Sequence, residues 1–180
     1  FALLYGMCYT NLLQMLELAG IPLLAKDRGE SDPLIICGGP CACNPTPVAA
    51  FMDAVLIGDG EDMTPEVTKA VQNAKRAGKS KTELLAELSA IRGVYIPSLK
   101  TEETLVVRRI VKDLDSAVFT GEPIVPYLGI VHDRVALEVM RGCTRGCRFC
   151  QAGYIYRPIR ERKSETLMEL ARQQIGCTGY

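Results

Sequence analysis

Short apolar runs and helical patterns alternate through the first part of the chain. Residues 34–37 and 54–57 are wholly apolar, as in strands that are buried on both faces of a sheet. Leucine spacing predicts a helix over residues 7–18, and a second, short helix is predicted over residues 46–52. Because strand, glycine-containing loop and helix occur twice in succession, the pattern predicts a doubly wound, parallel α/β sheet.

Helices and then strands are predicted in the next part of the chain. One helix is predicted to start at Thr64, and a capping box of Ser80 with Glu83 predicts the start of another. Two apolar, β-branched runs, 94–97 and 104–111, predict strands that form an edge hairpin. The helices of this region are expected to supply packing and no chemistry.

The chain is predicted to contain parts of two domains. Residues 112–131 hold several prolines and glycines and show little periodicity, so we place an inter-domain linker there, after a first domain of residues 1–111. The second domain is predicted over residues 132–180, with a strand at 135–140 and a helix capped by Ser164. One βα unit of a barrel is therefore expected at this end.

Composition indicates a globular protein of the cytoplasm. The apolar fraction is 48%, yet no run approaches the ~20 apolar residues of a membrane span, and no leader sequence precedes the first strand. The eight cysteines fall below the ~8–10% typical of disulfide scaffolds, so reduced thiols are expected. Since Phe1 already lies in an apolar, strand-like run, we expect a fragment that begins within one domain and stops early in the next.

Charge is distributed unevenly, although the formal net charge is zero. Acidic residues dominate the first 63 positions. The segment 141–163 has one acidic residue, Glu161, and a set of cations: Arg141, Arg145, Arg148, Arg157, Arg160, Arg162 and Lys163. Cations favour thiolates and offset the charge of a thiolate-bound cluster, and they could also contact phosphates or carboxylates, Arg157 and Arg160 in particular. A solvated basic face is the alternative.

Three cysteines within this basic segment are the strongest chemical signal. Cys143, Cys147 and Cys150 are four and then three residues apart in a loop that follows a predicted strand. Gly142 and Gly146 allow the close backbone approach that a loop around a metal requires. Three thiolates leave one iron of a four-iron cluster without a protein ligand. The sequence therefore predicts an iron–sulfur cluster with an open iron.

Two other interpretations of the same three cysteines require a fourth ligand. A structural zinc site could be completed by His132 or Cys177, and Cys177 could close a ferredoxin-like cluster. Neither residue has the spacing of a zinc finger. We expect Cys177 to be a small core residue at a helix end.

The pattern Cys-x3-Cys-x2-Cys, with Phe149 before the last cysteine, resembles the cluster loop of radical S-adenosylmethionine (SAM) enzymes. This resemblance implies that a 4Fe-4S cluster on Cys143, Cys147 and Cys150 binds SAM at the open iron and cleaves it reductively to a 5′-deoxyadenosyl radical. It also implies that Phe149 packs beside the adenine and that a flavodoxin- or ferredoxin-type protein supplies the electron. No residue of the chain is assigned a catalytic role, and the fragment alone is expected to be inactive.

The first domain resembles the cobalamin (B12)-binding, Rossmann-like domain that precedes the barrel in one group of these enzymes. The resemblance implies cofactor contacts at Gly38, Gly39, Gly58 and Gly60 and is closest to a subfamily without known activity. Cobalamin binding stays open, because the cobalt-ligating Asp-x-His-x-x-Gly loop is absent. A vestigial domain that only packs on the barrel is the alternative. The resemblance rests on residues 9–11, 19–23, 38–41, 44–45 and 57–61.

Other candidate groups in the first domain are interpreted as structural. Cys37, Cys41 and Cys43 match no metal motif and are expected to be core and loop residues. Adjacent carboxylates at residues 59–62 favour a helix start through the helix dipole. The substrate is undefined, with RNA not excluded. The competing class is a non-enzymatic module in which the cysteine loop binds zinc and the Rossmann-like domain binds a partner.

Overall fold

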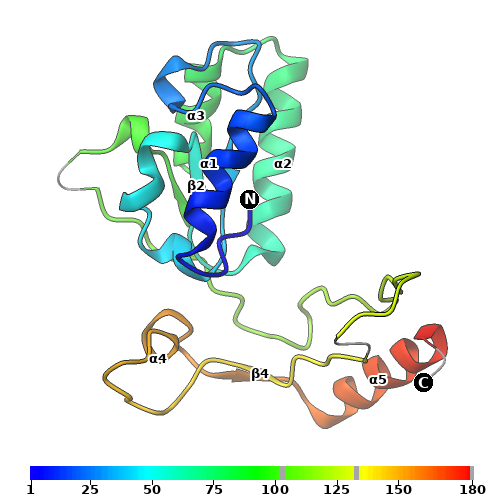
Figure 1. Cartoon of the computed structure of the whole chain (residues 1–180). Coiled ribbons are helices and arrows are strands. Elements are labelled where there is room, and N and C mark those ends of the chain that lie inside the picture. The colour runs from blue at the N-terminus through cyan, green and yellow to red at the C-terminus, as the bar shows by residue number, and fades with distance from the viewer. Residues whose placement is uncertain (102–103, 132–133, 179–180) are drawn as a thin grey trace. The chain divides into compact units, whose positions relative to one another are not determined.

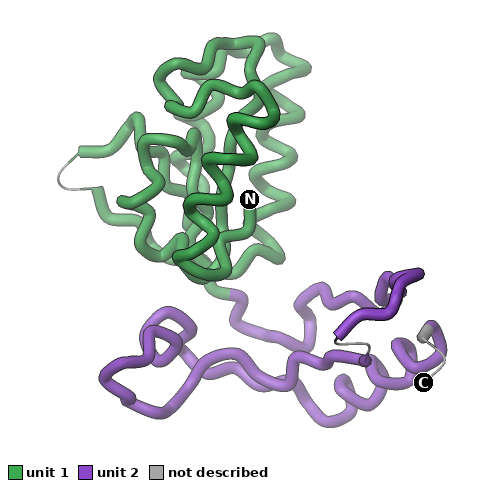
Figure 2. The backbone as a smooth tube through the Cα atoms, in the orientation of Figure 1, with its two compact units in different colours: residues 1–110 green, residues 111–180 purple. Residues whose placement is uncertain are grey.

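The computed structural model describes residues 1–101, 104–131 and 134–178 (Figure 1). The chain forms two compact units, Phe1–Ile110 and Val111–Tyr180 (Figure 2). Each unit combines helices with a small sheet, so the protein belongs to the mixed α/β class. In the described part of the chain, no helix is both long and apolar enough to cross a membrane.

Three α-helices form the helical part of the first unit: α1 (Cys8–Leu18), α2 (Gly60–Arg76) and α3 (Lys81–Ser89). The prediction of α1 is confirmed, with Leu12 and Leu16 buried one turn apart. The capping box is also confirmed, because the Ser80 side chain accepts from the Glu83 backbone N–H while the Glu83 carboxylate accepts from Ser80.

The start of α2 differs from the prediction. The helix begins at Gly60, so Pro65 lies inside it and not in its first turn. Glu61 and Asp62 lie in the first turn, where carboxylates stabilise the positive end of the helix dipole, as their structural interpretation predicted. The short helix predicted over residues 46–52 is a 3₁₀ helix, Thr46–Phe51.

A three-stranded sheet forms the centre of the unit, in the order β1 (Ile36–Cys37), β2 (Ala54–Leu56) and β3 (Val94–Tyr95). β1 and β2 are parallel, with Ile36 opposite Ala54, whereas β2 and β3 are antiparallel, with Leu56 opposite Val94. The parallel arrangement predicted from the first two strands is therefore found for β1 and β2, whereas β3, which was expected in an edge hairpin, joins the sheet antiparallel to β2. A βαβ unit has one helix between two parallel strands, but two helices connect β2 to β3. The second helix adds one more reversal of chain direction, so β3 runs antiparallel to β2.

Two other predicted strands are reduced to single bridges. In the run 1–5 only Ala2 pairs, parallel to Gly38, and in the run 104–111 only Arg109 pairs, parallel to Gly58. The predicted edge hairpin is absent from the described residues, because Arg109 pairs beside β2 and not with β3. Its turn was predicted at 100–103, which lies partly outside the described residues.

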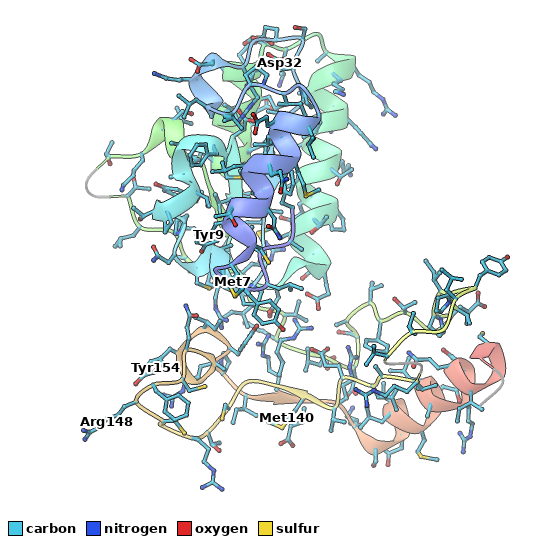
Figure 3. All side chains as sticks on the ribbon, viewed as in Figure 1. Met7, Tyr9, Asp32, Met140, Arg148 and Tyr154 are labelled. Atoms are coloured by element: carbon cyan, nitrogen blue, oxygen red, sulfur yellow. The ribbon has the colours of Figure 1, made fainter. Side chains whose placement is uncertain are left out.

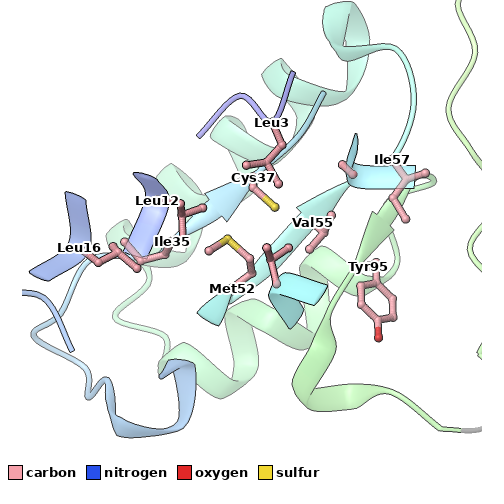
Figure 4. Packing of buried hydrophobic residues seen from close by; sticks show 11 residues of the cluster. Leu3, Leu12, Leu16, Ile35, Cys37, Met52, Val55, Ile57 and Tyr95 are labelled. Carbon is pink, nitrogen blue, oxygen red and sulfur yellow. The ribbon is translucent and has the colours of Figure 1, made fainter. Parts of the chain in front are cut away.

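The sheet separates two hydrophobic clusters. Val55 and Tyr95 face the cluster that contains Leu12 and Leu16 of α1 (Figure 4). The neighbouring strand residues face the other cluster, which contains residues of α2 and α3: Ala54, Val94, Met63, Val67, Ala74, Leu84, Leu85 and Leu88. Alternate strand residues thus bury side chains on both faces, as their wholly apolar sequences predicted. The unit is a helix–sheet–helix sandwich.

A buried ionic network ties together the segments at the start of these strands. Asp53 is 3% exposed and precedes β2. Its Oδ2 accepts from Arg28 Nε at 3.1 Å and from the Ile35 backbone N–H at 2.7 Å, and its Oδ1 lies 2.9 Å from Lys81 Nζ. Arg28 also donates to the carbonyl oxygens of Pro22, Leu23 and Phe51. The network joins both parallel strands to the first turn of α3.

The second unit contains an antiparallel pair of short strands and two helices. β4 (Met140–Arg141) pairs with β5 (Arg160–Glu161), while α4 (Ala152–Ile155) and α5 (Ser164–Thr178) complete the unit. The strand predicted over residues 135–140 is shorter and later, because only its end finds a pairing partner. The described residues form this antiparallel pair and no parallel barrel strand.

Residues 111–120 pack within the second unit. Val111 and Leu114 are buried, and the Thr120 carbonyl accepts from Gln174 Nε2 at 2.9 Å. On α5, Gln174 is buried through this contact. Ile175, which was expected to lie on the apolar face of the helix, is instead 45% exposed.

Asp53→Ala is expected to lower the free energy of unfolding by about 3 kcal/mol or more, because it leaves the buried Arg28 without its anionic partner. Glu87→Ala breaks the ion pair between Glu87 and Lys79, two side chains that are each more than one third exposed. This variant is expected to lower the free energy of unfolding by less than about 1 kcal/mol. Urea denaturation of the two variants measures the difference. Equal losses would contradict the role given to Asp53.

Candidate metal centre

The cysteine loop, residues 143–150, lies in a longer segment that the pairing of β4 with β5 closes. Arg141 of β4 lies opposite Arg160 of β5, so the chain leaves and returns at the same point. Gly142 has a φ of +110°, and a Cβ there would lie 2.9 Å from both the Tyr156 carbonyl oxygen and the Ile159 Cα. Only glycine fits this conformation and this contact. The residue before Cys143 is thus fixed by close backbone packing.

The three thiols are available as ligands. Cys143 and Cys150 are half-buried, Cys147 is exposed, and all are free of disulfides. The Cys150 backbone N–H donates to the Cys147 carbonyl at 3.1 Å, which closes a turn between these two ligands. Nowhere in the described residues do three Cys, His, Asp or Glu side chains converge as a metal-binding group. The donor set suits an iron–sulfur cluster, since free thiolates are its usual ligands.

The middle of the loop is open. A Cβ added at Gly146 would have no neighbouring atom within 4 Å, and the Phe149 side chain is 92% exposed. Arg148 extends outward from the loop (Figure 3). Gly153 of α4 is tighter, because a Cβ there would lie 3.0 Å from the Arg145 carbonyl oxygen. The structure therefore fixes the loop at Gly142 and packs Gly153 against Arg145, while Gly146 and Phe149 remain open.

The cations of this segment divide into two groups. Arg145 and Arg148 are exposed in the loop, and no acidic residue occurs between Gly142 and Arg160. Arg160 is 7% exposed and donates to the carbonyl oxygens of Val111, at 2.7 Å, and Pro158, at 3.1 Å. The suggestion that Arg160 contacts a ligand carboxylate or phosphate is wrong, because the side chain is occupied by backbone.

Glu138 was missed by the sequence reasoning. Its carboxylate accepts hydrogen bonds from Arg141 and Arg162. The hydrogen bonds from Arg141, followed by the charge of Arg141 and the contact with Arg162, hold the pKa of Glu138 below its usual value. A sequence signal existed, since Glu138 is the only acidic residue between Arg134 and Arg160.

The glycines assigned to cofactor binding contact the chain itself. Gly39 has a φ of +101°, and a Cβ there would lie 2.9 Å from the Leu3 carbonyl oxygen. Gly58 has a φ of +122°, and a Cβ there would overlap the Arg109 carbonyl oxygen. Gly38 pairs with Ala2, and Gly60 is the first residue of α2. These contacts show a structural use of the glycines, while their contact with a cofactor stays a prediction.

The remaining thiols include core residues. Cys37 is 1% exposed, and burial raises its pKa to about 11. Cys41 and Cys43 pack against the same hydrophobic cluster, and burial raises the pKa of Cys43. The interpretation of Cys37 as a core residue is confirmed. Cys177 is exposed, so its expected place in a core is wrong. His132, the other suggested zinc ligand, lies outside the described residues.

Comparison with known proteins adds independent information. A family model described as "Radical SAM proteins, N-terminal" matches residues 1–97. An uncharacterised protein of Methanocaldococcus jannaschii is 28% identical over 155 residues, which cover 84% of this chain and 31% of that protein. The chain thus spans about a third of this relative. No solved structure matches the chain. The match to residues 1–97 does not include the cysteine loop.

Gly142→Ala is expected to destabilise the second unit by about 2 kcal/mol, because the new Cβ meets backbone and the positive φ is strained. Gly146→Ala is the matched control, since nothing lies near its Cβ position and its φ is not positive. Limited proteolysis between residues 143 and 160 measures the effect. Equal cleavage rates in the two variants would contradict the packing described for Gly142.

Proposed function

The chain belongs to the radical SAM proteins through their N-terminal region, and from this membership we propose that the full-length protein is a radical SAM enzyme. Its cluster would be held by Cys143, Cys147 and Cys150. The observation that carries the proposal is the position of these thiols, with four-then-three spacing, downstream of the matched residues 1–97. The family match and the cysteine motif are independent of each other and agree.

The three cysteines suit an open-iron cluster by number and by environment. They are free of disulfides and at least partly accessible, although in the described part of the chain they do not converge as a group of three. When bound, such a group supplies the one-electron reductive cleavage of SAM to a 5′-deoxyadenosyl radical. The task of these residues is to present three thiolates and leave one coordination position to SAM.

The residues around the thiols support this task. Arg145 and Arg148 place two cations in the loop, where they would offset the negative charge of a thiolate-bound cluster. Phe149 exposes an aromatic face beside the last cysteine and would pack on the adenine of SAM. Gly142 lets the loop begin against residues 156–159, which keeps Cys143 close to the point where the chain returns.

The finer architecture is part of the proposal. We assign residues 1–111 to a Rossmann-like domain of the cobalamin-binding type, 112–131 to a linker whose first residues pack within the second unit, and 132–180 to the start of a partial (β/α) barrel. Cobalamin would contact Gly38, Gly39, Gly58 or Gly60. The described contacts of Gly39 and Gly58 are with backbone, so they lend no support to that step. The visible absorbance of the full-length protein tests cobalamin binding: a retained corrinoid would support it, and the absence of a corrinoid would favour a vestigial domain.

We further propose a reducing, cytoplasmic setting and a one-electron carrier of the flavodoxin or ferredoxin type as reductant. The eight free cysteines support the setting. The substrate is left open, with RNA among the candidates, because the chain spans about a third of its relative.

The proposal predicts release of 5′-deoxyadenosine from SAM by the full-length protein after anaerobic reconstitution with iron and sulfide. Dithionite serves as reductant, and the product is measured by chromatography. A colourless protein that holds one tightly bound zinc and releases no 5′-deoxyadenosine would overturn the proposal in favour of a zinc-binding module.

Cys147→Ala is expected to lower bound iron by about tenfold, because two thiolates cannot retain the cluster. Cys41→Ala is the matched control, since Cys41 packs against the core of the first unit and lies far from the motif in sequence. Iron and sulfide are measured per folded chain. Equal iron loss in both variants would show that the ligands are misassigned.

A further inference from the structure

A single carboxylate joins the two strands that hold the cysteine loop. Glu138 Oε1 accepts from Arg141 Nε at 2.8 Å, and Glu138 Oε2 accepts from Arg141 Nη2 at 3.0 Å. The same Oε2 accepts from Arg162 Nη2 at 3.3 Å. The two bonds to Arg141 form a bidentate contact, which fixes orientation as well as distance. One anion therefore orders two guanidinium groups.

The two arginines lie on opposite sides of the loop. Arg141 ends β4 and is followed directly by Gly142 and the first cysteine. Arg162 follows β5, and its backbone N–H donates to the Val139 carbonyl at 3.0 Å. Glu138 thus connects the segment that leads into the loop with the segment that leaves it.

Arg162 makes this connection deep in the unit. Its side chain is 1% exposed, Nη1 donates to the Leu114 carbonyl, and the guanidinium carbon lies 5.1 Å from the centroid of the Phe119 ring. Its Nε has no hydrogen-bond partner among the residues that the structure describes. A buried cation of this kind needs an anion, which Glu138 provides.

The backbone alone specifies the register of the strand pair weakly. β4 and β5 contribute two residues each. A slip of one residue in so short a pair would turn every side chain to the other face and displace the first cysteine. The contact between Glu138 and Arg162 joins the two segments in the observed register, in which Arg141 lies opposite Arg160, while the contact with Arg141 fixes the carboxylate on its own segment.

We infer that Glu138 is a positioning residue for the metal centre. By holding Arg141 and Arg162 together, it fixes the register of β4 and β5, keeps Gly142 against residues 156–159, and sets where Cys143 starts the loop. Glu138 is neither a ligand nor a catalytic residue. The inference rests on the proposed function, because it gives Glu138 a role toward a cluster held by the three cysteines.

The test compares Glu138→Gln with Glu161→Gln in the full-length protein. Glu161 is exposed on β5, so its variant removes the same charge from the same strand pair without touching the arginine contacts. After reconstitution, Glu138→Gln is expected to lose iron to a chelator about tenfold faster than wild type and to show an altered EPR signal of the reduced cluster. Glu161→Gln is expected to match wild type. If Glu138→Gln loses iron at the wild-type rate and shows the wild-type EPR signal of the reduced cluster, the inference is overturned.

A second variant covers the case in which Glu138→Gln fails to fold. Arg141→Lys keeps a cation and leaves the contact between Glu138 and Arg162 in place, but it cannot form the bidentate contact. It is expected to change iron loss and EPR in the same direction, to a smaller extent. Wild-type behaviour of Arg141→Lys, together with an unfolded Glu138→Gln, would reduce Glu138 to a purely structural role and so overturn the inference.

A readout without metal separates this inference from the proposed function. In the iron-free protein, alkylation of Cys143 by iodoacetamide is followed by mass spectrometry. The released loop is expected to react about fivefold faster in Glu138→Gln, with the rate at Cys41 unchanged. Equal rates at Cys143 in wild type and variant would overturn the inference. If wild type assembles no cluster, the proposed function fails, and the alkylation rates still decide whether Glu138 positions the loop.

Discussion

The fixed start of the cysteine loop is the constraint on which the second unit depends. Gly142 lies so close to the backbone of residues 156–159 that no side chain fits there. The pairing of β4 with β5 brings these segments together, and the two arginines bound by Glu138 lie on either side. A short, otherwise weak strand pair thereby becomes a defined base for three thiols. The open middle of the loop leaves those thiols accessible to a cluster.

Glycines also allow close backbone packing in the first unit, where they lie beside the strands of the sheet. Gly39 and Gly58 lie where neighbouring backbone approaches the ends of β1 and β2. Because these glycines have no side chain, the backbones of Leu3 and Arg109 can approach β1 and β2 and add a pairing segment at each edge of the sheet. The buried network of Asp53, Arg28 and Lys81 fixes the opposite ends of the same strands. The unit is thus held at both ends of its parallel pair by contacts within the chain.

Local patterns in the sequence predicted the features that are local in the structure. The periodicity of α1 and the capping box at Ser80 need only neighbouring residues, and both are confirmed. The antiparallel direction of β3 follows from the two helices that precede it. Both helices were predicted, but the sequence analysis did not draw their consequence for the direction of the strand. Asp53 and Glu138 were missed because their partners include arginines 25 and 24 residues away. The cysteine spacing identified candidate ligands, but the residues that position them became visible only in three dimensions.

The central claim is that three thiolates of one loop hold a cluster with one iron left for SAM. Mössbauer spectroscopy of the full-length protein, reconstituted with ⁵⁷Fe, tests it most directly. The account predicts a 4Fe-4S spectrum in which one iron of about four changes its isomer shift when SAM is added. A spectrum that SAM leaves unchanged, or a protein that takes up zinc in place of iron, would contradict it.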